Sequence, residues 1–312
     1  MKEKKTVVIF GASSFIGSNL CAYLRKDFRV IGTYHRNKYF CPGVLTIPCD
    51  VLAKEEVRLV MLAFKPDVAI YCVGNSNINY CSENEEVADA LNTGGLVNVI
   101  DFSQRHKTQV CFISSAHVFS GDKENYTEID IPDPSTTYGK TMASSEFFLQ
   151  RNCLNYLIIR CCKIYGRSFN PEKPSWFDFM QQIFFERKTF SFDNRIKLGF
   201  LDVNFLAYSL KEILKKNPNN RMFQLSSQDS ATFHEFAKMY ANIFNDEKTA
   251  ISSGKMKFPL IKDLTTNFEK GIDQVYSLDT SNIESYLNIM NPTIEDSLNF
   301  SFKNYGGISS VK

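Results

Sequence analysis

The residues from Val7 to Gly17 constrain the fold of this chain more than any other stretch of the sequence. A short apolar run, residues 7–10, leads directly into Gly11, and Gly17 follows six positions later at the start of an apolar pattern with helical spacing. This order predicts a buried parallel strand, a tight turn and the first turn of a helix. The backbone N–H groups at the start of such a helix attract anions, so the stretch predicts a site for the diphosphate of a dinucleotide above the strand.

Ser14 stands where the glycine fingerprint of dinucleotide-binding turns has its middle glycine. Gly11 has no Cβ and can adopt the backbone angles of the turn, and Gly17 allows the helix to approach the strand closely. Ser14 keeps its backbone N–H for a phosphate, and its hydroxyl offers another hydrogen bond. The cofactor-binding residues predicted from this turn are Gly11, Ser13, Ser14, Phe15, Ile16 and Gly17.

The composition is that of a soluble globular protein, with 312 residues, of which 44% are hydrophobic and 22% are charged. A net charge of +2, without arginine-rich or lysine-rich runs, gives no sign of nucleic-acid binding. The apolar run after the first residues is too short for a signal peptide or a membrane span. Nine cysteines without a Cys-x-x-Cys pair, and four histidines without metal-ligand spacing, predict a reduced, cytoplasmic protein without a metal site.

Strand and helix signals alternate through the first half of the chain. Apolar, β-branched runs predict strands, and the amphipathic patterns between them predict helices. The predicted strands lie at residues 29–34, 44–51, 66–74, 110–115 and 156–160, and the predicted helices at 54–64, 85–105 and 137–152. This alternation predicts an α/β fold with a doubly wound parallel sheet of the Rossmann type, whose ligands lie at the carboxyl ends of the strands.

The second half of the chain is less regular. Its patterns predict helices at 176–187, 204–215 and 232–245, and strands at 199–203 and 222–225. Thr232 and Glu235 have the spacing of a capping box. We predict an NAD(P)-binding Rossmann domain of residues 1–165 plus about 196–225, and a smaller C-terminal substrate-binding lobe of about 166–195 plus 226–312.

The end of the second predicted strand bears on the choice between NAD and NADP. NAD-binding sheets carry a carboxylate there, which accepts hydrogen bonds from the adenosine ribose. This chain instead has His35 and Arg36, which favour the additional phosphate of NADP(H) over NAD(H), unless Arg36 is an ordinary solvated charge. Asp50 follows the third strand and is placed to bond the adenine. The other predicted cofactor contacts are Val51, Cys72, Val73 and Gly74.

A serine at a strand end and a tyrosine at the start of a helix form the candidate catalytic pair. Ser115 ends the strand at 110–115, and Tyr138 lies in the first turn of the helix at 137–152. Two such hydroxyls can converge on one carbonyl oxygen, where the serine donates a hydrogen bond and the phenol delivers or removes a proton. The alternative is a strand-end serine and a surface tyrosine that share no ligand.

These motifs together resemble those of the extended short-chain dehydrogenase/reductases, in the NAD(P)-dependent epimerase/dehydratase superfamily. The resemblance is nearest to the dTDP-4-dehydrorhamnose reductase branch and runs from Val7 to about Leu225. It rests on the glycine turn, Asn92, the segment 114–121, Tyr126-Thr127-Glu128 leading to Pro134, Tyr138-Gly139-Lys140, and the segment 160–166. It implies catalysis by Ser115 and Tyr138, and a nicotinamide cofactor contacted by Asn92 and Tyr138.

The chain departs from the family pattern Tyr-x-x-x-Lys because Met142 occupies the lysine position. Residues at i and i+4 share a helix face, so the family's lysine lies beside the phenol, lowers its pKa and contacts the nicotinamide ribose. A thioether does neither, and Lys140 points to the far side of a helix. Either another group supplies the charge, or Tyr138 keeps its ordinary pKa of ~10, or the protein does not catalyse.

Three basic residues are candidate substrate contacts. Lys163 either supplies the missing charge at the substrate pocket or caps a strand end. Arg167 and Arg195 lie where the substrate lobe begins, and each could help to clamp a diphosphate or could be a surface residue.

The function predicted from these residues and from the resemblance is NADP(H)-dependent reduction of a 4-keto group on a nucleotide-linked sugar. One alternative is a nucleotide-sugar epimerase that keeps its NAD(P) tightly bound. Another is a non-catalytic NADP(H)-binding protein with a regulatory or sensing role, motivated by Met142 and Ser14. The expected partner is a small molecule, a nucleotide-diphosphate sugar, and neither nucleic acid nor a membrane is expected as a partner. The helices at 85–105 and 137–152 are compatible with a homodimer.

Overall fold

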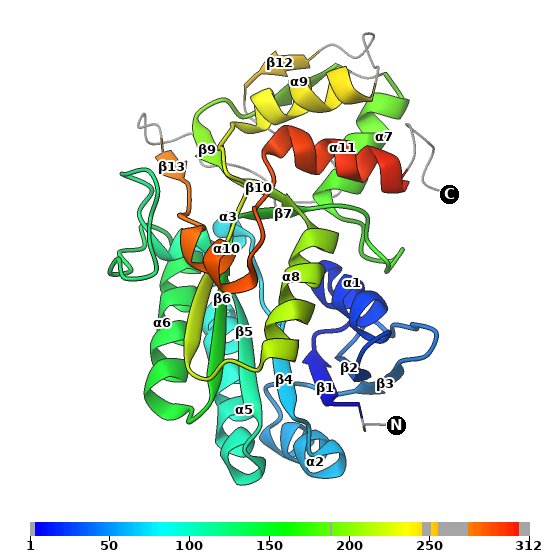
Figure 1. Ribbon diagram of the computed structural model, residues 1–312, viewed down its shortest axis with the longest axis vertical. Helices are drawn as coiled ribbons and strands as arrows, with labels where there is room; N and C mark the ends of the chain where they lie inside the picture. The colour runs from blue at the N-terminus through cyan, green and yellow to red at the C-terminus, as the bar shows by residue number, and fades with distance from the viewer. Residues whose placement is uncertain (1–3, 188, 245–250, 255–273, 306–312) are drawn as a thin grey trace.

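The computed structural model describes residues 4–187, 189–244, 251–254 and 274–305. At its centre lies a seven-stranded sheet in the order β11-β6-β5-β4-β1-β2-β3, in which neighbouring strands are parallel (Figure 1). The predicted doubly wound sheet is therefore confirmed. Its strands are β1 (Thr6–Phe10), β2 (Arg29–Tyr34), β3 (Leu45–Pro48), β4 (Val68–Tyr71), β5 (Gln109–Ser115), β6 (Tyr156–Cys161) and β11 (Arg221–Leu225).

Helices cover both faces of the sheet (Figure 1). Alternate residues of β1 face the two layers, because Val7 and Ile9 belong to one buried cluster and Val8 and Phe10 to the other. Burial on both faces explains why the sequence of β1 reads as a continuous apolar run. One layer contains α1 (Phe15–Leu24) and α8 (Val203–Lys216), and the other contains α2 (Lys54–Phe64), α5 (Gly95–Ser103) and α6 (Thr137–Asn152).

The helix predicted at 85–105 is not continuous. It comprises α4 (Glu85–Asp89), a π-helical turn at Ala90–Gly94, α5, and a 3-10 turn at Gln104–His106. The π turn carries Asn92, whose Nδ2 donates a hydrogen bond to the Thr141 hydroxyl of α6 at 2.8 Å. A single π turn within a helix has no distinct sequence signature, so the helical periodicity did not reveal it.

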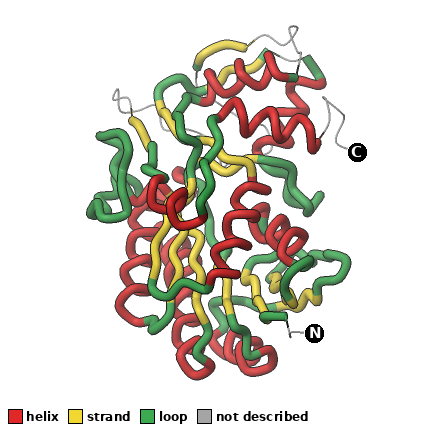
Figure 2. The backbone as a smooth tube through the Cα atoms, viewed as in Figure 1, coloured by secondary structure: helices red, strands yellow, loops and turns green. Residues whose placement is uncertain are grey.

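Short strand pairs and helices lie beyond the carboxyl ends of the sheet (Figure 2). The helices there are α7 (Trp176–Phe185), α9 (Phe233–Ile243) and α11 (Ile294–Tyr305), while α3 (Ile78–Glu83) and α10 (Ser281–Leu287) lie nearer the sheet. The pairs are β7 (Lys163–Tyr165) with β10 (Phe200–Asp202), β8 (Phe190–Phe192) with β12 (Ile251–Ser253), and β9 (Ile196–Leu198) with β13 (Gln274–Tyr276). Parts of the predicted substrate lobe, residues 245–250, 255–273 and 306–312, lie outside the described residues.

In the second half of the chain, the predicted capping box and two predicted strands can be compared with the structure. The capping box is present, because the Glu235 amide donates to the Thr232 hydroxyl at 3.2 Å and the Thr232 amide to the Glu235 carboxylate at 2.8 Å. The strand predicted at 222–225 is β11 and pairs with β6, but the one predicted at 199–203 is β10 and pairs with β7 outside the main sheet. The segment predicted to return to the sheet near 196–225 therefore only partly joins it.

Candidate active site

A cavity of about 420 Å³ lies over the carboxyl ends of β1, β2 and β4. The topology brings the predicted cofactor contacts together there, although they come from separate turns of the chain. The predicted residues that line it are Gly11, Ser13, Ser14, Phe15, His35, Asp50, Val51, Cys72, Val73 and Gly74. Ile16 lines a second cavity instead, and Gly17, Arg36 and Asn92 are not part of the lining of either cavity within the described residues.

The glycine turn has the geometry expected from the sequence. Gly11 has a φ of +87°, and a Cβ added at Gly17 would lie 2.2 Å from the Gly11 carbonyl oxygen, so both positions require glycine. The Ser14 hydroxyl caps α1 by accepting a hydrogen bond from the Gly17 amide at 3.0 Å. The first turn of α1 contains no acidic residue. Its N-terminus therefore keeps the electrostatic preference for an anion that a dinucleotide diphosphate satisfies.

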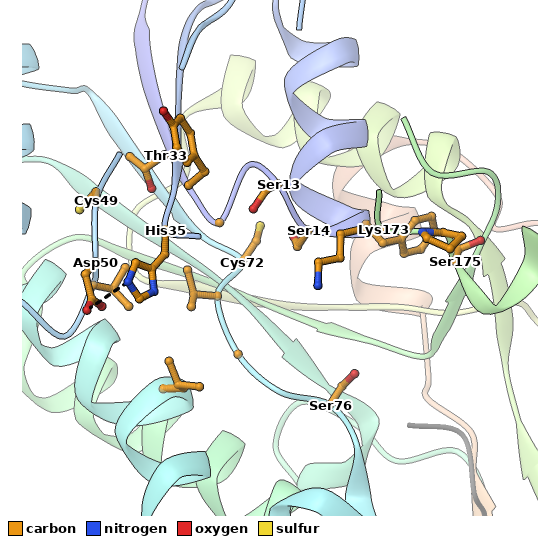
Figure 3. A pocket seen from close by; sticks show the side chains of 18 of the residues that line it. Ser13, Ser14, Thr33, His35, Cys49, Asp50, Cys72, Ser76, Lys173 and Ser175 are labelled. Atoms are coloured by element: carbon orange, nitrogen blue, oxygen red, sulfur yellow. Dashed lines mark ion pairs between the residues drawn. The ribbon is translucent and has the colours of Figure 1, made fainter. Parts of the chain in front are cut away.

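The two ends of this cavity carry different charged groups (Figure 3). His35 and Asp50 lie at one end, with His35 Nε2 3.6 Å from Asp50 Oδ2. Lys173 lies at the other end, on the far side of Ser13 and Ser14 in Figure 3. An adenosine at the first end and a diphosphate between the serines and Lys173 would suit this distribution.

No sequence pattern indicated Lys173, because it lies in an irregular segment after β7. The structure ties that segment to the glycine turn, since Asn170 Nδ2 donates to the Ser13 carbonyl at 2.8 Å. Asn19 Nδ2 likewise donates to the Arg167 carbonyl at 3.1 Å. Other lining residues that the sequence did not indicate are Thr33, Tyr34, Cys49, Ser76, Leu91, Pro174, Ser175 and Trp176.

A second cavity, of about 300 Å³, contains the predicted catalytic pair. Ser115 at the end of β5 and Tyr138 at the start of α6 both line it, so they share one site. The Ser115 hydroxyl accepts a hydrogen bond from the His117 amide at 3.2 Å, and the His117 ring packs edge-on against Tyr138 with centroids 5.9 Å apart. Phe15, Ser76, Lys163 and Trp176 line both cavities, which makes the two cavities adjacent.

Burial raises the pKa of Tyr138 to about 12, and an interaction with the Ser115 side chain partly offsets the rise. The other groups that act on it are Cys81 and Cys161, and none of these groups is a cation. Met142, one helical turn later, is 6% exposed and packs in the apolar core. The surroundings of Tyr138 therefore favour the protonated phenol at neutral pH, and the choice among the outcomes that Met142 leaves open stays a prediction.

Asn92 links two segments next to the site through hydrogen bonds of its side chain. Besides its bond to Thr141, its Oδ1 accepts a hydrogen bond from the Asn75 amide at 2.8 Å. The segment after β4 and the helix that carries Tyr138 are thus held by one side chain. Asn92 lines neither cavity within the described residues, and its contact with the cofactor stays a prediction.

The basic residues divide into one that reaches the cavities and two that do not. Lys163, at the start of β7, lines both cavities, and burial lowers its pKa to about 8. Arg167 Nε donates to Gln181 Oε1 at 3.2 Å, and the backbone of Arg195 donates to Asp193 Oδ1 at 2.9 Å. Within the described residues, neither arginine is part of the lining of the two cavities.

Among the described residues, no three His, Cys, Asp or Glu side chains gather closely enough to hold a metal ion. No helix in the described part of the chain has the length and apolar character needed to cross a membrane. On α6, Phe147 and Phe148 are 59% and 41% exposed.

Comparisons with known proteins agree with this geometry. A family model described as the RmlD substrate binding domain matches residues 5–262. Methionine adenosyltransferase 2 subunit beta of Rattus norvegicus is 26% identical over 200 residues, which are 63% of this chain and 60% of that protein. The probable low-salt glycan biosynthesis reductase Agl14 of Haloferax volcanii is 26% identical over 310 residues, covering 93% of this chain and 95% of that one.

A solved structure gives the same fold. The dTDP-4-dehydrorhamnose reductase of Bacillus anthracis, in complex with NADP, superimposes with a TM-score of 0.80 at 20% identity, covering 96% of this chain and 99% of that one. The chain spans about 60% of the length of the methionine adenosyltransferase subunits that it matches.

Proposed function

This chain belongs to the RmlD substrate binding domain family, and we propose that it is an NADP(H)-dependent oxidoreductase that reduces a 4-keto group on a nucleotide-linked sugar. The observation that carries the proposal is the adjacency of the two cavities. One suits a dinucleotide, and the other presents the Ser115 and Tyr138 hydroxyls. A carbonyl in the second cavity would lie next to the group bound in the first.

The chain's own residues have distinct roles in this proposal. A nicotinamide cofactor, when bound, supplies the hydride. Ser115 donates a hydrogen bond to the carbonyl oxygen and polarises it, and Tyr138 delivers the proton to that oxygen as negative charge develops. Phe15 and Trp176 line both cavities and give the region between them an apolar wall.

The protonation state of Tyr138 suits the proton donor that a reductase requires. An epimerase must first oxidise its substrate, and its phenol must then accept a proton. Because burial raises the pKa of Tyr138 to about 12, the phenol holds its proton at neutral pH. It is therefore prepared to donate a proton, which is the step that reduction requires.

The preference for NADP(H) is supported by the end of β2. No carboxylate follows that strand directly, and His35 and Arg36 offer cationic or hydrogen-bonding partners for the additional phosphate. Asp50 Oδ2 lies 3.6 Å from His35 Nε2, at the same end of the cavity. The expected measurement is a lower Kd for NADPH than for NADH, with the difference reduced in Arg36→Ala.

Single-turnover oxidation of NADPH with a panel of nucleotide-linked 4-keto sugars tests the proposed reaction. We expect absorbance loss with at least one member of the panel, and a rate lower by about 10²–10⁴ in Tyr138→Phe. Lys140→Met, a change at an exposed residue on the same helix, serves as the matched control. Tight NADPH binding without oxidation by any member would contradict a reductase.

That outcome would instead support a non-catalytic NADP(H)-binding subunit. Two observations favour this second candidate: Met142 in place of the family's lysine, and similarity to proteins named as a subunit of a methionine adenosyltransferase. A binding subunit would keep its affinity for NADPH in Tyr138→Phe and Ser115→Ala. It would also be recovered in complex with a larger protein when purified at native concentration.

A further inference from the structure

Lys163 is a cation enclosed by apolar walls. It begins β7, and its Nζ lies 5.8 Å from the ring centroid of Trp176 and 5.7 Å from that of Phe233. Among the described residues, no carboxylate forms an ion pair with its ammonium. The second cavity, as lined by the described residues, contains no Asp or Glu side chain.

A partly buried ammonium without a counter-ion is unfavourable, and the aromatic faces compensate for it only in part. The cost is visible in the pKa of Lys163, which burial lowers to about 8. Structural lysines avoid this cost by extending to solvent or by pairing with an acid. Lys163 lies at the wall of a binding cavity without such a partner, so a negatively charged group on the ligand would supply its missing counter-ion.

The cavity presents a single positive charge. The other basic group in its lining is His117, whose pKa is lowered to about 4 by burial and by the nearby charge of Lys163. His117 is therefore neutral at physiological pH, so the described lining would pair one ammonium with one negative charge. Most of the remaining wall is apolar, including Ile113, Leu198 and Phe233. A diphosphate would need more donors than this wall offers.

We propose that the sugar reduced by this protein carries a carboxylate, and that Lys163 binds this carboxylate beside Ser115 and Tyr138. The proposal rests on the proposed function and narrows its substrate class to acidic nucleotide-linked sugars. The carboxylate and the ammonium form a charge-assisted hydrogen bond inside the cavity, while the two hydroxyls remain available for the keto oxygen. Lys163 is then a specificity-determining residue that discriminates against the neutral sugar.

A matched pair of probes tests the proposal directly. UDP-glucuronic acid and UDP-glucose differ at one sugar carbon, which carries a carboxylate in the first and a hydroxymethyl group in the second. Calorimetry on the NADPH-saturated full chain should give a Kd for UDP-glucuronic acid that is lower by about 10- to 100-fold, the range expected for one hydrogen bond to a charged group.

Three variants identify the source of any difference. Lys163→Met should bring the two Kd values together by weakening UDP-glucuronic acid alone, and Lys163→Arg should retain part of the difference. Lys140→Met, which removes an exposed lysine outside both cavities, should leave both Kd values unchanged. Equal binding of the two probes to the unmodified protein overturns the proposal. Equal weakening of both by Lys163→Met also overturns it, because Lys163 would then contact the diphosphate that they share.

A second measurement does not depend on nucleotide recognition. The pKa of Lys163 can be followed by NMR titration of the protein with methylated lysines, in which the Lys163→Met variant identifies the Lys163 resonance. Free glucuronate should raise the pKa of Lys163 toward its ordinary value, whereas glucose should not. No shift with glucuronate overturns the carboxylate proposal. A shift with glucuronate, together with no binding of either UDP-sugar, supports the carboxylate site and contradicts the nucleotide-linked sugar of the proposed function.

Discussion

Arg160 on β6 and Glu146 on α6 form a buried ion pair that fixes the catalytic helix to the sheet. Arg160 Nη2 lies 2.8 Å from Glu146 Oε2, and both side chains are 2% exposed. The Ser114 hydroxyl, next to Ser115, donates to Glu146 Oε1 at 2.5 Å. One carboxylate therefore connects the strand end that carries Ser115 with the helix that carries Tyr138.

Removal of this carboxylate should destabilise the fold strongly. Glu146→Gln keeps the size of the side chain but leaves the Arg160 guanidinium buried without its counter-ion, which typically costs about 3–5 kcal/mol. The free energy of unfolding, measured with urea, should fall by that amount. Lys54→Met is the control, because it breaks an exposed pair with Asp101 and should cost no more than about 1 kcal/mol. Similar small losses in both variants would contradict a dominant role for the buried pair.

The Tyr138 environment predicts the effect of restoring the family's lysine. In Met142→Lys, the ammonium would lie one helical turn from Tyr138 and lower the pKa of the phenol from about 12. A more acidic phenol donates its proton more readily, so the rate of NADPH oxidation should rise about 10-fold. The ultraviolet titration of tyrosinate checks the pKa independently of turnover.

Met142→Leu is the matched control for this variant. Leucine keeps the apolar volume of Met142, which is 6% exposed, and adds no charge. Its Tyr138 titration should match that of the unmodified protein. If Met142→Lys also leaves the titration unchanged, the lysine does not reach the phenol and proton delivery depends on other groups.

Local sequence signals predicted much of the fold and part of the site. The turn from Gly11 to Gly17 encodes its own geometry, because glycines and a serine cap act within one strand–turn–helix unit. Ser115 and Tyr138 could be paired because each lies at the end of a predicted element, where parallel sheets place their sites. The contacts that shape the glycine turn are close in sequence, and the pairing of Ser115 with Tyr138 follows from the topology of the sheet.

Other features depend on contacts that a sequence pattern does not encode. Lys173 reaches the cofactor cavity only because Asn170, in the same loop, is bonded to Ser13, far away in the sequence. The raised pKa of Tyr138 results from burial by several elements. Arg167 and Arg195, chosen from the sequence for their charge, line neither cavity within the described residues, and the Arg167 guanidinium is bonded to Gln181. Charge alone therefore did not indicate which cation faces the cavities.

The position of Lys173 predicts a contribution to cofactor affinity. If its ammonium binds the cofactor diphosphate beside Ser13 and Ser14, Lys173→Met should raise the Kd of NADPH about 10-fold. Lys173→Arg should retain most of the affinity because it keeps the charge. Fluorescence titration at low and high salt checks the mechanism, since the loss should shrink as salt screens the contact. An unchanged Kd at low salt would exclude Lys173 from the diphosphate site.

Lys163 predicts a pH dependence of stability with a definite sign. Its pKa falls from 10.5 to about 8 on folding, so between these values the unfolded chain holds a proton that the folded chain has released. Lys163 therefore lowers the free energy of unfolding by its full amount below about pH 8. This destabilisation decreases as the pH rises through the window and is lost above about pH 10.5. At one pKa unit per about 1.4 kcal/mol, that effect amounts to roughly 3 kcal/mol at most.

Lys163→Met removes this destabilising contribution while keeping a side chain of similar length among Trp176 and Phe233. The ligand-free variant should be more stable than the unmodified protein at pH 7, and the gap should narrow as the pH approaches 10. Urea unfolding at pH 7, 8.5 and 10 checks both statements, and subtracting the two proteins cancels the titration of the groups that Lys163 does not influence. A variant that is less stable at pH 7, with a gap independent of pH, would mean that the Lys163 ammonium is already compensated before any anion binds.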